Sequence, residues 1–136
     1  MARCQCGALH VQVQGEPESV VACSCIACQR RTGSVLGVGA YYPRDRVSFH
    51  GEAREHVRAA DSGFSFHTFF CPSCGTSLYW WSDRGPVRIG IAVGAFADPT
   101  FPKPERSVYE TSKHTWLHFA PGTLGFEHGR DSKRTR

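Results

Sequence analysis

The chain has 136 residues, of which 40% are hydrophobic and 21% are charged. This length suits one compact domain, and nine Phe, four Tyr and three Trp can fill a hydrophobic core, which excludes wholesale disorder. The formal charge of +4 is concentrated in residues 130–136, where four basic residues and one acid give +3 and leave +1 for the rest. We therefore expect a single domain over residues 1–129, a disordered basic tail over 130–136, and no nucleic-acid partner.

The chain shows no segment suited to a membrane or to export. Its longest apolar stretches, residues 35–42 and 89–97, are far shorter than the roughly 18 residues that a membrane span requires. The first residues run directly into cysteines, without the apolar region of a secretion signal. We expect a cytoplasmic protein with no membrane partner, and the oligomeric state is left open.

Alternating apolar and polar residues predict short strands along most of the chain. The first is marked by Leu9, Val11 and Val13, which alternate with polar neighbours. Further strands are predicted over residues 19–23, 35–42, 46–50, 54–58, 64–70, 77–81, 87–96 and 108–111. Only residues 26–32, which Gly33 terminates, have room for a helical turn or two. The predicted fold class is all-β, with short strands and no internal repeat.

The seven cysteines fall into three groups at short spacing. These are Cys4-x-Cys6, Cys23-x-Cys25-x-x-Cys28 and Cys71-x-x-Cys74. An odd number of cysteines without a secretion signal argues against disulfides, because the cytosol keeps thiols reduced. The Cys-Pro-Ser-Cys-Gly stretch at residues 71–75 has the form of a zinc knuckle, in which a tight turn directs two sulfurs at one ion. The grouping therefore indicates metal ligation.

The seven sulfurs divide most simply into four and three, because structural zinc takes four ligands. The central three cysteines are close in sequence and can converge without help from the rest of the chain. Joining the other two pairs closes a loop of 64 residues, which costs about 4 kcal/mol of loop entropy, whereas structural zinc supplies on the order of 10 kcal/mol. The sequence thus predicts two zinc ions: a structural one on Cys4, Cys6, Cys71 and Cys74, and a second on Cys23, Cys25 and Cys28.

The three-cysteine cluster leaves room for a fourth ligand from outside the chain. Three protein ligands with an open fourth position are typical of zinc that takes part in a reaction. Two alternatives stay open. His114 or His118 could complete the shell and make the site structural, or the three thiols could serve redox chemistry.

These motifs resemble the family of glutathione-dependent formaldehyde-activating enzymes, which includes the centromere protein V relatives. The matching elements span most of the chain: Cys4-Gln5-Cys6-Gly7, the stretch from Cys23 to Arg30, Phe70 to Gly75, Thr111-Ser112-Lys113 and Trp116-Leu117-His118. The resemblance implies a small zinc-stitched β-sandwich of the Rab-chaperone-like zinc fold. It also implies a structural zinc on four cysteines and a second zinc on the central three, in agreement with the division above.

The resemblance also implies a reaction. Glutathione would take the open zinc position as a thiolate and add to formaldehyde, giving S-hydroxymethylglutathione. The chain would then be a carbon-sulfur lyase or synthase whose partners are a small thiol and an aldehyde. Candidate contacts for the carboxylates of glutathione are Arg30, Arg31 and Lys113. No general acid or base is assigned.

Two other functions fit the same residues. A non-catalytic zinc module with a chaperone or protein-interaction role needs only the four-cysteine site. A carrier or sensor of the thiol would carry the same motifs, because a thiol adds readily to a small aldehyde without help.

Overall fold

The computed structural model describes residues 1–136 and divides them into two compact units. The first unit comprises Met1–Glu18 and Ala40–Pro99, and the second comprises Ser19–Gly39 and Thr100–Arg136. The chain passes from one unit to the other three times, so neither is a continuous piece of sequence. The expectation of a single domain over residues 1–129 stays a prediction.

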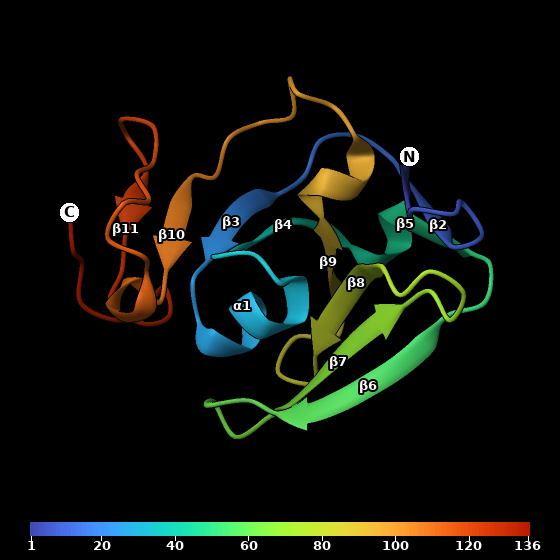
Figure 1. Cartoon of the computed structure of the whole chain (residues 1–136), viewed down its shortest axis with the longest axis horizontal. Coiled ribbons are helices and arrows are strands. Elements are labelled where there is room, and N and C mark those ends of the chain that lie inside the picture. Colours follow the sequence, from blue (N-terminus) through green and yellow to red (C-terminus); the bar gives the residue numbers. More distant parts are fainter. The chain divides into compact units, whose positions relative to one another are not determined.

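The first unit contains two antiparallel sheets. The smaller has the order β1-β2-β5 and is built from β1 (Ala2–Arg3), β2 (His10–Val13) and β5 (Val47–His50). In the larger, successive strands lie side by side: β6 (Arg54–Ala59), β7 (Ser65–Phe70), β8 (Ser77–Ser82) and β9 (Arg88–Ala92), green to olive in Figure 1. Strand β4 (Gly37–Pro43) begins in the second unit and ends in the first, followed by the 3-10 turn η1 (Arg44–Arg46).

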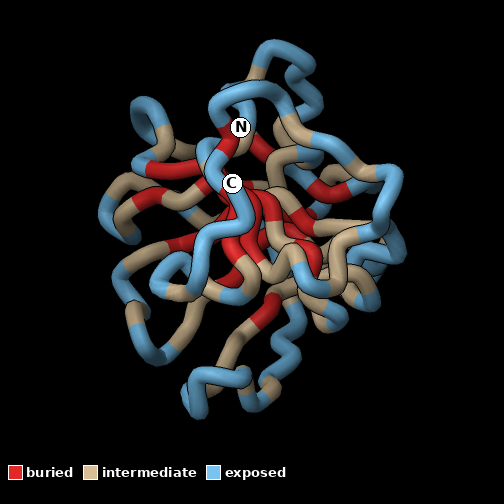
Figure 2. The backbone as a smooth tube through the Cα atoms, turned by 90° about the vertical axis from the view of Figure 1, so that its left-hand side faces the viewer, coloured by how far each residue is buried: buried red, intermediate tan, exposed pale blue.

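The core of the first unit is centred on β8 and β9. Leu78, Tyr79 and Trp80 are consecutive buried residues, so both faces of β8 are covered at its middle. Ile89 and Ile91 are fully buried on β9. Along the chain, segments with buried residues alternate with exposed turns (Figure 2). The last four residues are exposed.

Gly90 allows the Trp80 indole to cross β9. Trp80 and Gly90 are register partners, and a Cβ at position 90 would collide with the indole ring. The indole also donates a hydrogen bond to the Tyr41 hydroxyl at 3.2 Å. We expect Gly90→Ala to displace the ring and lower the free energy of unfolding by about 1–3 kcal/mol, measured by urea denaturation. Gly94→Ala is the control because a methyl group there meets no atom within 4 Å, and an equal loss in both variants would contradict the prediction.

The second unit contains three parallel strands and the single α-helix of the chain. The strands lie in the order β11-β10-β3 and are β3 (Ser19–Cys23), β10 (Arg106–Val108) and β11 (Leu124–Gly125). Helix α1 (Ile26–Thr32) begins after Cys25, whose sulfur accepts a hydrogen bond from the Cys28 amide at 3.3 Å. It ends at Gly33, which is left-handed at φ 69° and donates to the Gln29 carbonyl. The prediction of an all-β fold is confirmed, with one helix of seven residues.

Two predicted strands end differently in the structure, and each is followed by a 3-10 turn. The strand expected over residues 108–111 lies at Arg106–Val108, and Tyr109 at φ 57° turns the chain into the 3-10 turn η3 (Glu110–Ser112). The strand expected over residues 87–96 stops at Ala92, and the 3-10 turn η2 (Val93–Phe96) follows, with Ala97 at φ 51°. The two-residue strands β1 and β11 lack the alternation that would predict them.

The basic tail makes defined contacts within the second unit. Thr135 donates its amide to the Gly125 carbonyl, and Glu127 donates its amide to the Lys133 carbonyl, so the tail runs beside the segment that contains β11. The Arg136 guanidinium lies 2.8 Å from the Glu110 carboxylate. The structure thus shows partners for residues whose composition predicts disorder. None of the helices is long or apolar enough to cross a membrane.

Candidate metal centres

The first candidate centre joins two turns of the first unit. Cys4 and Cys6 lie just after β1, while Cys71 and Cys74 lie in the turn between β7 and β8. Each turn closes with a glycine amide that donates to the carbonyl of the first cysteine, from Gly7 at 3.1 Å and from Gly75 at 2.8 Å. Both glycines have a positive φ, 84° and 79°, which other residues rarely adopt. The turns therefore direct four sulfurs toward one point.

The spacing of the four sulfurs fits a tetrahedral ion. All four Sγ atoms lie within 4.8 Å of one another, with Cys4 and Cys6 at 3.6 Å and Cys6 and Cys71 at 3.7 Å. A zinc–sulfur bond of about 2.3 Å places the sulfurs of a tetrahedron about 3.8 Å apart. The donor set and its geometry thus suit zinc.

Hydrogen-bond donors around this cluster favour thiolates. Thr76 lowers the pKa of Cys74 to about 5, mainly through its hydroxyl, 3.3 Å from Sγ, and its amide. The Ala8 amide lowers the pKa of Cys6, but the neighbouring sulfurs outweigh it and raise that pKa to about 11. Four thiolates this close therefore need a cation to coexist.

The second candidate centre lies in the second unit, where β3 passes into α1. Cys23 ends β3, Cys25 caps the helix and Cys28 lies in its first turn. Their three Sγ atoms lie within 4.8 Å of one another, and no histidine or carboxylate belongs to this group. His114 and His118, the two candidate fourth ligands, are therefore outside it. The protein itself supplies three sulfurs.

Two of the three thiols resist ionisation. Hydrogen bonds to Cys25 and Cys28, together with burial, raise the pKa of Cys23 far above its usual range. A hydrogen bond with Cys23 lowers the pKa of Cys28, but Cys25 and burial outweigh it, so that pKa is also raised. A cation held by the three sulfurs would remove this repulsion, so this donor set also suits zinc.

A polar network centred on Gln29 surrounds the three-cysteine centre. The Gln29 side-chain amide donates to the Ser24 carbonyl at 2.8 Å and to the Ser112 carbonyl at 3.0 Å. The Ser112 hydroxyl also donates to the Ser24 carbonyl, at 2.7 Å. The side-chain oxygen of Gln29, Oε1, lies 3.2 Å from Nε2 of His114. The network thus connects the backbone between two ligands to the segment after η3.

Sequence reasoning missed this network as a unit. Gln29 and Ser112 both belong to motifs that carry the family resemblance, but 83 positions separate them. A side chain that bonds to a distant backbone carbonyl leaves no spacing or periodicity to detect. The one available signal was that both residues are polar and belong to the matching motifs.

The three candidate substrate contacts lie in different surroundings. Arg30 is exposed in the last turn of α1. Arg31 is half-buried, and one of its guanidinium nitrogens lies 2.7 Å from the position that a Cβ on Gly37 would occupy. The positive charge of Arg31 lowers the pKa of Cys28. Lys113 donates from Nζ to the Leu117 carbonyl at 2.7 Å. Of the three cations, Arg31 is the one whose charge acts on a cysteine of the centre.

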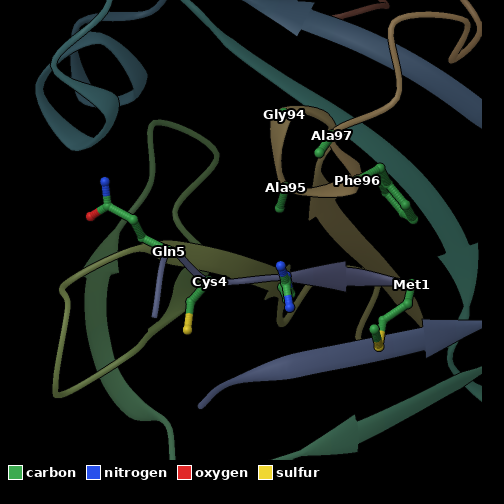
Figure 3. Close-up of a pocket in the computed structure, with 8 residues that line it drawn as sticks. Met1, Cys4, Gln5, Gly94, Ala95, Phe96 and Ala97 are labelled. Atoms are coloured by element: carbon green, nitrogen blue, oxygen red, sulfur yellow. The ribbon is translucent and has the colours of Figure 1, made fainter. Parts of the chain in front are cut away.

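A pocket of about 270 Å³ lies in the first unit. Figure 3 shows Gly94 to Ala97 on one side of it and Cys4 and Gln5 on the other, with Met1 at its end. The Cys4 sulfur points away from Gly94 to Ala97. The volume is below the range typical of ligand sites. The pocket therefore borders the four-cysteine cluster at Cys4, but the Cys4 sulfur does not point into it.

The fold and the two centres define a β-rich protein with two cysteine clusters that could each hold a metal ion. The family model of the glutathione-dependent formaldehyde-activating enzymes matches residues 1–112, and the chain belongs to that family. The fold is similar to the crystal structure of a Rhodobacter sphaeroides protein, with a TM-score of 0.54 and 20% sequence identity. The match covers 69% of this chain and 84% of that chain.

Proposed function

We propose that the protein binds zinc at both clusters and uses the three-cysteine centre to add glutathione to formaldehyde, as a carbon-sulfur lyase. The observation that supports this most directly is a group of three sulfurs without a fourth ligand from the chain. Zinc bound there would favour the thiolate of an incoming thiol, of which only about 3% is ionised at pH 7 when the pKa is ~8.5. Family membership supports glutathione and formaldehyde as the substrates.

The chain's own residues would bind and orient the thiol. Arg31 is the strongest candidate for a glutathione carboxylate because its guanidinium lies beside the cysteine centre. Arg30 would contribute from the exposed side of the same helix turn. Lys113 would serve a second carboxylate only after releasing the Leu117 carbonyl. Seven free cysteines also suit a reducing compartment, and we place the protein in the cytoplasm.

A second candidate function rests on the four-cysteine cluster. That cluster is complete within the first unit and needs nothing from the three-cysteine centre. A zinc module that binds a protein partner would use it alone. In that case Cys23, Cys25 and Cys28 would be open to alkylation in protein that holds one zinc per chain.

Isothermal titration of glutathione into zinc-loaded protein tests the proposal. We expect saturable binding to the wild type and a loss of at least about 30-fold in affinity for Cys25→Ser, because the variant lacks a ligand of the second ion. Elemental analysis should give two zinc ions for the wild type and one for the variant. Absence of heat with glutathione and with other small thiols, in protein that holds two zinc ions, would rule out this substrate class.

A further inference from the structure

The orientation of the Gln29 amide determines which nitrogen of His114 carries a proton. Both acceptors near Gln29 Nε2 are backbone carbonyls, of Ser24 and Ser112. A carbonyl oxygen only accepts hydrogen bonds, so the NH₂ group must face them and Oε1 must face His114. The 3.2 Å contact between Oε1 and Nε2 is then a bond that the imidazole donates. Nε2 carries the proton, and the lone pair of neutral His114 lies on Nδ1.

The segment that contains His114 is held in place at several points. The Leu117 amide donates to the His114 carbonyl at 3.1 Å, and Nζ of Lys113 donates to the Leu117 carbonyl. The Trp116 ring packs against the imidazole at 5.6 Å between centroids and an interplanar angle of 75°. His114 itself is exposed, and Trp116 is 64% exposed. The turn therefore presents a fixed imidazole to solvent next to a large apolar surface.

We propose that His114 transfers the proton of the thiol reaction and that Gln29 is the residue that positions it. The inference rests on the proposed function, since it requires a thiol at the three-cysteine centre. Gln29 follows the ligand Cys28 directly and bonds to the carbonyl of Ser24, between two other ligands. Through this one side chain the imidazole is connected to the scaffold of the centre. Imidazole is the side chain best suited to exchange protons near neutral pH.

The proton balance of the step needs no other reactant. The thiol S–H bond breaks, and its proton goes to Nδ1 of His114. The sulfur electron pair forms a bond to the carbonyl carbon of the aldehyde, and the π electrons of the carbonyl become a lone pair on oxygen. Nδ1 then returns the proton to that oxygen. The product carries an S-hydroxymethyl group, and His114 is neutral again with its proton on Nε2.

Nitrogen-15 NMR of the histidine side chains tests the positioning part without any turnover. We expect neutral His114 to carry its proton on Nε2, with slowed solvent exchange because Gln29 accepts that proton. Gln29→Met should speed the exchange. His114→Gln assigns the signal, because the imidazole resonances of His114 are absent from that variant while its amide can still donate to Gln29. A proton on Nδ1, or exchange as fast in the wild type as in Gln29→Met, would overturn the role given to Gln29.

Exchange NMR of glutathione with formaldehyde tests the proton transfer itself. We expect His114→Gln to reduce the acceleration above the spontaneous rate by about 100-fold while glutathione affinity changes by less than about threefold. His118→Gln is the control, an exposed histidine four residues further along. Undiminished acceleration in His114→Gln would overturn the inference and leave the proposed function standing. No acceleration by the wild type would overturn both, whether or not glutathione binds.

Discussion

Replacing Cys71 with serine is expected to unfold the first unit. Cys71 is fully buried, and its sulfur lies 3.7 Å from that of Cys6, which is on a turn 65 residues away. Structural zinc binding supplies on the order of 10 kcal/mol, comparable with the whole stability of a small domain. We therefore expect a loss on the order of 5 kcal/mol or more in the free energy of unfolding. Thermal denaturation followed by circular dichroism, with elemental analysis of the same samples, measures it.

A matched variant separates this effect from the general loss of a cysteine. Cys25→Ser removes a ligand from the other cluster and should leave amide protection in β7 and β8 intact, while Cys71→Ser should abolish it. Hydrogen exchange resolves the two units because it reports on individual amides. A strong chelator should reproduce the Cys71→Ser result in the wild type. Two zinc ions and an unchanged melting temperature in Cys71→Ser would show that the four sulfurs do not share an ion.

Glu110→Gln is expected to destabilise the second unit by about 1–3 kcal/mol. The Glu110 side chain is only 4% exposed, and Oε1 accepts hydrogen bonds from the Thr135 hydroxyl at 2.6 Å and from the Arg136 guanidinium at 2.8 Å. The substitution removes the negative charge from this buried position, and the Arg136 side chain, which is 42% exposed, loses its charge partner. Because Glu110 begins η3, whose Ser112 contacts Ser24 and Gln29, loosening of the Gln29 network should accompany the loss. Urea denaturation and hydrogen exchange measure the two effects.

The same carboxylate predicts a dependence on pH. Burial raises the pKa of Glu110, but the hydrogen bonds from Thr135 and Arg136 outweigh it, so the folded pKa lies below its usual value. A lowered folded pKa stabilises the fold fully above the unfolded value of about 4.3, and this contribution is lost as the pH falls through the folded pKa. The difference in stability between wild type and Glu110→Gln should thus be constant at neutral pH and shrink below about pH 4.3.

An exposed ion pair in the same unit provides the control for Glu110. Glu105 lies 2.9 Å from Arg106, but its side chain is 53% exposed. Exposed pairs contribute at most about 1 kcal/mol, so Glu105→Gln should have little effect at any pH. Equal losses in both variants would show that the tail contact of Glu110 adds nothing beyond an ordinary surface pair.

The strand-rich fold and the two groups of sulfurs could be predicted from the order of the residues alone. Short alternating segments predict strands because side chains on a strand point to opposite faces in turn, and β2 shows this in buried Val11 between less buried neighbours. The cysteine groups were predictable because ligands in a tight turn must be close in sequence. The pairing of the first turn with that of Cys71 followed from the number of ligands that zinc takes.

The residues that surround the three-cysteine centre could be identified only from the folded chain. Gln29, Ser112 and His114 meet because η3 brings a distant segment to α1, and hydrogen bonds to backbone carbonyls impose no pattern on the residues between. The tail is similar, because Arg136 contacts Glu110, which is 26 positions away in the sequence. Local spacing reports on contacts that a turn or strand creates, whereas contacts between distant segments depend on how the whole chain packs.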